Sequence, residues 1–375
     1  MPTLQDDLRH AIQLRRWAWA ALNERPAPLP PASPRAWQLF LDREACAVAL
    51  ARVPGLGLPD PVRRRAQLES QQILLARAEL AAVAHAVHSA GLEVIPLKGT
   101  DALLTPATAL PLKDVDVLAP PGATTAAEEA LGSAGFGTAR SRSYLHVVLA
   151  RPGTSTPVEL HGTIWPQAAL SSSDLWNAAS SARSIPGLRA LDPADHLWLC
   201  LVHVVAVHPD RAGRLRDLLI IRAAVKQCSA KQMEIVARRM AAHPMTAELG
   251  IELAIAVGRD TPLDRQGRDR IAATWYALDA LVARTPIGTT LRMALSSWAS
   301  MIAAPSVSWR TLAQRLFTTG GNSRLRGVAW LERRIPPLGR LARVGIRLVW
   351  IGPTIAVALP YASFARRAAR MAVPD

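Results

Sequence analysis

Four short β-strand patterns lie close together in this chain, between two long stretches of helical pattern, and this arrangement constrains its fold most. The strand patterns are LEVIPL at 92–97, DVDVLA at 114–119, SYLHVVLA at 143–150 and TPVELHGTI at 156–164. On either side, apolar residues recur every three or four positions, from about residue 34 to 90 and from 192 to 280. The sequence therefore predicts an α+β fold, with a small sheet between helical flanks.

A length of 375 residues and a hydrophobic share of 50% predict a folded chain of two or three domains. We expect a helical lead-in over 1–90, the sheet-bearing domain over 91–190, a helical domain over 191–280, and a basic, apolar helical tail over 281–375. The long helix before the sheet should end at Gly91, a typical C-terminal stop.

The positive charge of the chain is concentrated in the tail. Residues 281–375 carry 14 arginines against Glu332 and Asp375, a net charge of +12 out of +15 for the whole chain. Within the tail, Leu348 to Ala365 is an uncharged run of 18 residues, at the lower edge of what spans a bilayer and weakened by Pro353 and Pro360.

Three uses of this tail are open: a packed helical domain, a contact with an anionic membrane surface, or nucleic-acid binding. Nucleic acid is the least favoured partner, because aromatic side chains do not alternate with the arginines as a stacking surface requires. Peripheral membrane contact is slightly favoured over packing.

The cysteines and the start of the chain indicate a reducing compartment. Cys46, Cys200 and Cys228 are too few and too scattered for a disulfide framework. The first ten residues carry acids where a secretory signal would have a basic and then an apolar stretch. We expect a cytoplasmic protein, at the inner face of the membrane if the tail binds lipid.

The pair Asp114 and Asp116 is the strongest chemical motif. Side chains alternate along a strand, so both carboxylates should face the same side while Val115 and Val117 face the core. Such a pair is costly unless a cation lies between the two groups, and hard oxygen ligands favour Mg²⁺. Glu159 alternates with Val158 and Leu160 in another strand, and would join the same patch if the two strands are neighbours.

A second motif, Lys98-Gly99-Thr100, lies where a strand leads into a helix. Gly99 would let the backbone approach a phosphate closely, and Thr100 would either cap the helix or donate its hydroxyl to a phosphate oxygen. Lys98 would add a point charge to a phosphate, or pair with Asp101 or with the aspartates.

Residues outside these motifs have structural alternatives. His161 shares a face with Glu159 and would hold that carboxylate or the acceptor, unless it is purely structural. The spacing of His196, His203 and His208 favours structural roles over metal binding. Asp217 would pair with a neighbouring arginine or face the active site.

The order PLKG, KDVDVLA, LGSAGF and VELHG resembles a bacterial nucleotidyltransferase family of the DNA polymerase beta-type superfamily. The resemblance extends over about Trp37 to Arg222 and implies a small mixed β-sheet palm with helical flanks. It also implies that Asp114, Asp116 and Glu159 are the metal carboxylates. The chain differs from the family at Leu110, where an arginine is usual.

The resemblance implies that Gly99 and Thr100 contact the triphosphate. We add Lys98, Lys113 and His161 to the candidate nucleotide contacts, with Lys113 replacing the missing arginine in charge but not in geometry.

These motifs together predict a transferase dependent on Mg²⁺, or Mn²⁺, that moves a nucleoside monophosphate from a nucleoside triphosphate such as ATP to a hydroxyl of a small molecule, peptide or protein. Glu159 or one of the aspartates would take the proton of that hydroxyl. Two alternatives stay open: a catalytically silent protein that binds a nucleotide or a partner, and a membrane-associated accessory factor of a biosynthetic pathway.

Overall fold

The computed structural model describes residues 3–25, 27–105, 108–142, 145–180, 185–208, 211–282, 298 and 355–373. The chain divides into two compact units. Unit 1 comprises Met1–Glu44, His208–Leu215 and Asp260–Asp375, and unit 2 comprises Ala45–Val207 and Arg216–Arg259. The division into four consecutive segments made from the sequence stays a prediction.

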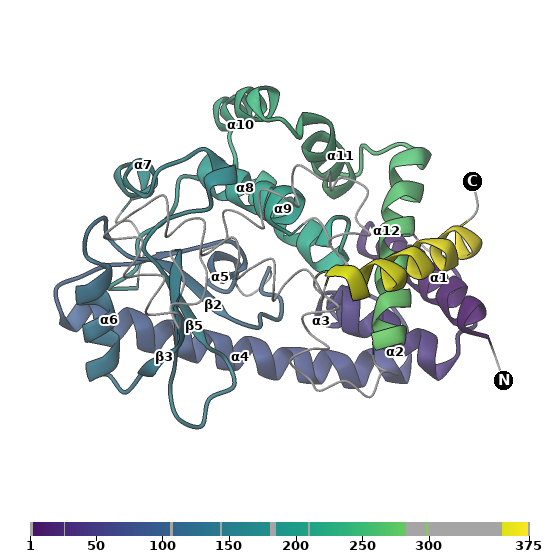
Figure 1. Ribbon diagram of the computed structural model, residues 1–375, viewed down its shortest axis with the longest axis horizontal. Helices are drawn as coiled ribbons and strands as arrows, with labels where there is room; N and C mark the ends of the chain where they lie inside the picture. Colours follow the sequence, from purple (N-terminus) through teal and green to yellow (C-terminus); the bar gives the residue numbers. More distant parts are fainter. Residues whose placement is uncertain are drawn as a thin grey trace. The chain divides into compact units, whose positions relative to one another are not determined.

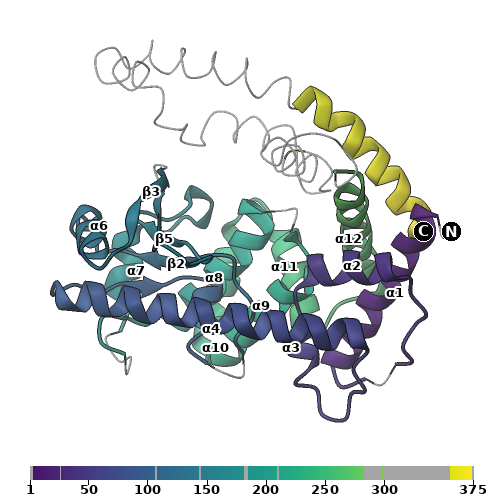
Figure 2. The same ribbon diagram turned by 90° about the horizontal axis from the view of Figure 1, so that it is seen from below.

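Unit 1 is helical in its described part. Its helices are α1 (Leu4–Leu22), α2 (Pro34–Glu44), α12 (Pro262–Val282) and a further helix over 355–372. Helix α1 begins with a capping box, in which Thr3 and Asp6 each accept the other's backbone N–H. It packs against both α2 and α12 (Figure 2), with Trp17 and Trp37 meeting edge to face.

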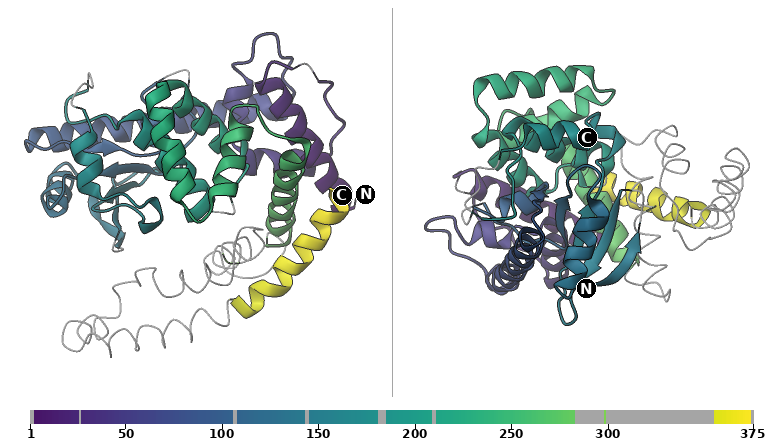
Figure 3. Two further views of the ribbon diagram at one scale, coloured as in Figure 1. Left: turned by 90° about the horizontal axis from the view of Figure 1, so that it is seen from above. Right: turned by 90° about the vertical axis from the view of Figure 1, so that its left-hand side faces the viewer.

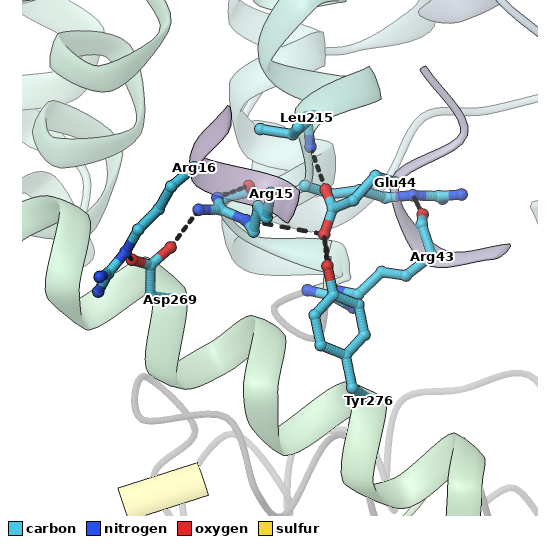
Figure 4. Close-up of polar contacts among 9 residues, drawn as sticks. Arg15, Arg16, Arg43, Glu44, Leu215, Asp269 and Tyr276 are labelled. Carbon is cyan, nitrogen blue, oxygen red and sulfur yellow. Dashed lines mark hydrogen bonds and ion pairs between the residues drawn. The ribbon is translucent and has the colours of Figure 1, made fainter. Parts of the chain in front are cut away.

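A network of buried charges links the segments of unit 1 (Figure 4). The carboxylate of Glu44, fully buried, accepts hydrogen bonds from the Leu215 backbone N–H at 2.7 Å and from the Tyr276 hydroxyl at 2.8 Å. The guanidinium groups of Arg15 and Arg43 lie 3.7 and 3.5 Å from the same carboxylate. Because an unpaired buried charge costs several kcal/mol, this network holds the 208–215 segment within unit 1.

Unit 2 contains a five-stranded mixed sheet in the order β1-β2-β5-β4-β3. Its strands are β1 (Ile95–Pro96), β2 (Val115–Leu118), β3 (Gly137–Arg142), β4 (His146–Ala150) and β5 (Val158–His161). Strands β2 and β5 run parallel, and the other neighbouring pairs run antiparallel. The predicted α+β class, with its small mixed sheet and helical flanks, is confirmed.

Helices α4, α5 and α6 pack against strands of this sheet. The helices of unit 2 are α3 (Ala47–Leu50), α4 (Asp60–Ser89), α5 (Gly99–Ala102), α6 (Thr124–Ser133), α7 (Ser172–Ala178), α8 (Pro193–Val202), α9 (Leu215–Gln227, whose first residue belongs to unit 1), α10 (Ala230–Ala242) and α11 (Thr246–Ala256). Two short turns, η1 (Pro166–Ala168) and the π-helical η2 (His203–Val207), complete the unit. Helix α4 runs along one side of the sheet in Figure 2, and α8 lies above the sheet in Figure 1. Helix α8 packs on α10 and α11, which are green in Figure 3.

The two faces of the sheet differ in chemistry, as strand alternation requires. Val115, Val117, Val158 and Leu160 are completely buried and alternate with the polar residues Asp116 and Glu159. The burial of Val115 and Val117 confirms the prediction that they belong to the core.

Helix α4 ends as predicted, with Gly91 in the left-handed region at φ 71°.

The strand bounds differ from those predicted. β3 was not predicted: it lies at the edge of the sheet, and its sequence, GTARSR, lacks the apolar alternation of a strand with a buried face. β1 is reduced to two residues, since Pro96 has no N–H for a ladder and Val94 bridges instead to Leu188.

The uncharged run at 348–365 lies partly outside the described residues. Its described part belongs to the helix over 355–372. This helix has buried alanines along one side, and Val357, Leu359, Phe364 and Met371 are exposed. No helix among the described residues combines the length and apolarity needed to cross a bilayer.

Candidate active site

Asp116 and Glu159 lie directly opposite each other on the parallel strands β2 and β5. Register partners point to the same face of a sheet, so the two carboxylates share one face. Asp114 lies half-buried at the bend just before β2, so strand alternation does not extend to it, and its place beside the other two acids stays a prediction. The topology thus brings together acids that are far apart in the sequence.

Two histidines extend this acidic face. His161 follows Glu159 by two residues, is 1% exposed, and has its Nε2 2.9 Å from Asp116 Oδ1 and 3.6 Å from Glu159 Oε2. His146 is the register partner of His161 on β4, and its Nε2 lies 3.9 Å from Glu159 Oε1. The two imidazoles therefore approach different oxygens of one carboxylate.

Lys98 supplies a further positive charge. Its Nζ lies 2.9 Å from Asp116 Oδ1 and 4.6 Å from the centre of the Trp165 ring. Burial opposes the ionisation of Asp116, but the Lys98 ammonium and the His161 hydrogen bond outweigh it and hold the pKa of Asp116 well below its usual range. The sequence predicts that Lys98 contacts a phosphate, Asp101, or the aspartates of the Asp114–Asp116 motif. In the structure it pairs with Asp116.

The same carboxylates act on the histidines. Burial alone would lower the pKa of His161, but hydrogen bonds to Asp116 and Glu159 raise it above its ordinary value. For His146, burial dominates and lowers the pKa. The site thus shifts the pKa values of the two neighbouring imidazoles in opposite directions and favours the charged form more at His161 than at His146.

Lys98, Gly99 and Thr100 form a tight turn rather than a long helix start. Lys98 has a φ of 50°, uncommon for a residue with a side chain, and α5 is only four residues long. The Thr100 hydroxyl, fully buried, accepts a hydrogen bond of 2.8 Å from the Asp116 backbone N–H. The prediction that Thr100 caps the helix is therefore wrong. Lys98 is the N-cap residue of α5, and the Thr100 hydroxyl instead links the turn to β2 through the Asp116 N–H.

Packing accounts for the small residue at Gly99. A Cβ at this position would lie 2.8 Å from a methyl of Leu112 and 3.3 Å from one of Ile220. Leu110 is also buried, in place of the arginine usual in the family, whereas Lys113 is exposed. The loop before Asp114 is thus largely apolar.

The helical side of unit 2 contributes residues that sequence reasoning did not assign to the site. His203, in η2, has its Nε2 3.5 Å from Lys98 Nζ, and its ring packs on Trp165 at 5.3 Å. His196, in α8, has its Nε2 3.0 Å from the Lys98 carbonyl oxygen. π-helical turns are frequent at functional sites, but their place cannot be read from residue spacing. Together with His146, these side chains surround the acidic face.

Asp217 pairs with its neighbour Arg216, as one of the two alternatives for this residue predicts, with 3.0 Å between Oδ1 and Nη2. Arg216 also donates a hydrogen bond of 3.0 Å to the Pro111 carbonyl oxygen. The pair therefore supports the loop that leads to Asp114.

The donor set fits a divalent cation. Carboxylate oxygens are the ligands that Mg²⁺ and Mn²⁺ prefer, and Asp116 and Glu159 present them on one face. In addition, ligand atoms of His146, Glu159 and His161 all lie within 4.8 Å of one another. The site can hold a cation and, beside Lys98, the negative charge of a phosphate.

Comparison with known proteins agrees with this geometry. Residues 45–256 match the family of uncharacterised nucleotidyltransferases, a span that nearly coincides with unit 2. No curated protein and no solved structure is significantly similar to the chain. Since the match covers more than half of the sequence, this chain belongs to the uncharacterised nucleotidyltransferase family.

Proposed function

We propose that this protein is a divalent-metal-dependent nucleotidyltransferase that moves a nucleoside monophosphate from a nucleoside triphosphate to a hydroxyl of a small molecule, peptide or protein. The observation that carries the proposal is the in-register pairing of Asp116 with Glu159 on one face of the family's domain. Mg²⁺ or Mn²⁺, when bound, would hold the triphosphate and lower the pKa of the acceptor hydroxyl.

Each residue has a part in the proposed reaction. Asp114, Asp116 and Glu159 would hold the metal, and Lys98, whose ammonium lies beside Asp116, would turn to the triphosphate together with the exposed Lys113. Gly99 and Thr100 would position the turn against the phosphates, and His161 would orient Asp116.

The chemistry balances without a further reactant. The acceptor oxygen bonds to the α-phosphorus, the bond from that phosphorus to the bridging oxygen breaks, and pyrophosphate leaves. Glu159, of which 23% of the side chain is exposed, or one of the aspartates takes the acceptor proton.

The test is turnover by the full chain. Labelled ATP, GTP, CTP and UTP are supplied with Mg²⁺ or Mn²⁺ and candidate acceptors, and pyrophosphate and labelled products are measured. Asp116→Asn should abolish turnover, whereas Glu129→Gln, a change at an exposed acid of α6, should not. Absence of both turnover and triphosphate binding by calorimetry would refute the proposal.

A catalytically silent nucleotide- or partner-binding protein is the second candidate. The pairing of Lys98 with Asp116 at 2.9 Å and the buried Leu110 in place of an arginine favour it. Triphosphate binding that depends on Lys98, without pyrophosphate release for any acceptor, would distinguish it from an enzyme.

A membrane-associated accessory role would belong to the tail. In the described helix over 355–372, Phe364 and Met371 are half-exposed and lie near Arg366, Arg367 and Arg370 in sequence. Apolar side chains next to arginines suit an anionic lipid surface. Deleting residues 341–375 should release the protein from anionic vesicles while leaving nucleotide binding intact.

A further inference from the structure

The acidic face of unit 2 includes nitrogen ligands, which a pure magnesium site would not need. His146 and His161 are register partners on β4 and β5, and Glu159 lies two residues before His161 on the same face. All three present a ligand atom within 4.8 Å of the others. The backbone register of the two adjacent strands β4 and β5 therefore gathers two imidazoles and a carboxylate.

We propose that His146, Glu159 and His161 form a binding site for one divalent transition-metal ion, of the Zn²⁺, Co²⁺ or Mn²⁺ class. A catalytic role for this ion would rest on the proposed function. Binding of the ion would not, and can be measured on its own.

The distances suit one shared ion. His146 Nε2 lies 3.9 Å from Glu159 Oε1, and His161 Nε2 lies 3.6 Å from Glu159 Oε2. Two ligands of one ion at metal–ligand distances of about 2.1 Å stand roughly 3.0–3.5 Å apart. The two nitrogen–oxygen distances exceed this range by a few tenths of an ångström, and all three ligand atoms lie within 4.8 Å of one another. An inward movement of these side chains would place both nitrogens and the Glu159 carboxylate around a single centre.

Ligand chemistry decides the class of ion. Imidazole nitrogen suits Zn²⁺ and chemically similar ions such as Co²⁺ better than Mn²⁺, whereas Mg²⁺ prefers oxygen and retains several waters. Two histidines with one glutamate is also a known donor set of zinc enzymes, in which a further position stays open to water or substrate. The general order of affinity places Mn²⁺ lowest, and the His₂Glu donor set favours Zn²⁺.

Asp116 supports this site from the side. Its Oδ1 lies 2.9 Å from His161 Nε2 and 2.9 Å from Lys98 Nζ. When an ion takes His161 Nε2, Asp116 keeps its partner Lys98, so the carboxylate is not left unpaired.

The experiment measures metal binding by the full-length protein without nucleotide. The metal-free chain is titrated by calorimetry with Zn²⁺, Co²⁺, Mn²⁺ and Mg²⁺, and bound metal is counted after dialysis. We expect one tight Zn²⁺ per chain and at least about 100-fold weaker binding in His146→Ala, since even ligand-supporting residues contribute 10–100-fold. Glu159→Gln should act similarly, and His85→Ala, at an exposed histidine of α4, should bind as the unmodified chain.

His146 is the primary target because 23% of its side chain is exposed, which makes misfolding less of a concern than at His161; circular dichroism verifies each variant. Zn²⁺ binding that survives His146→Ala, no tight binding at all, or Mg²⁺ binding as tightly as Zn²⁺ would each overturn the inference. Histidine-dependent Zn²⁺ binding without turnover would leave the inference standing while the proposed function fails.

Discussion

The bond between Thr100 and the Asp116 backbone can be tested with an almost isosteric substitution. Thr100→Val retains the shape of a fully buried side chain but removes the hydroxyl that accepts the Asp116 N–H at 2.8 Å. A buried amide left without a partner costs about 1–3 kcal/mol, which corresponds to a factor of about 5 to 160 in the local opening equilibrium. We therefore expect the Asp116 amide to exchange hydrogen faster by a factor in that range.

Hydrogen exchange followed by mass spectrometry over the segment containing Asp116 gives the local readout, and urea unfolding gives the global one. Thr100→Ser keeps the hydroxyl and removes one buried methyl, at about 0.8 kcal/mol, so it should retain the protection of the amide. Thr125→Val, at an exposed threonine of α6, controls for the change in residue type. Unchanged protection in Thr100→Val, or equal loss in Thr100→Ser, would refute the reasoning.

Three further substitutions test the hydrogen bond to Glu44, the ion pair of Lys98 with Asp116, and the protonation of His196. Tyr276→Phe removes the hydroxyl that donates to buried Glu44 and should lower the free energy of unfolding of unit 1 by about 1.5–3 kcal/mol in urea titration, whereas Tyr361→Phe should not. Lys98→Met leaves buried Asp116 with His161 but without the ammonium at 2.9 Å and should cost about 1.5–3 kcal/mol, much of it regained in Lys98→Met/Asp116→Asn; an additive double variant would contradict the pairing. Burial opposes protonation of His196, but Cys200, Asp101 and the Lys98 carbonyl raise its pKa to about 10, so its stabilisation should be complete below about pH 6.5 and disappear as the pH rises to about 10. Melting temperatures from pH 6 to 10 should fall less steeply in His196→Gln.

The acidic pair of Asp116 and Glu159 could be predicted from the sequence because strand alternation is a local rule. Each acid lies between apolar residues in its own strand, which fixes the face it occupies once the strand is paired. The same rule placed His161 on that face. The sequence does not predict whether the two strands are neighbours. The structure shows that β2 pairs with β5.

His146 and Lys98 show why the rest could not be predicted. The contact of His146 depends on the register of β4 against β5, which the turn between them and the packing of the sheet determine, not the residues of β4 themselves. The position of the Lys98 side chain depends on a φ of 50°, and lysine carries no sequence signal for that conformation. β3 escaped prediction because an edge strand needs no apolar face.

The charge balance of the site changes what its carboxylates imply about metals. The sequence predicts a bound cation between the adjacent acids, because like charges in a partly buried position repel. In the structure, the Lys98 ammonium and a His161 ring that favours the charged form lie against Asp116 and Glu159, so two positive groups face two negative ones. The domain can therefore fold with its own cations in place. Under the proposals above, a divalent ion would bind in competition with Lys98 and with a proton on His161. The ammonium would then turn to a triphosphate, and the proton would pass to solvent. It follows that stability of the metal-free protein says nothing against a metal site here, and that direct binding measurements are the decisive ones.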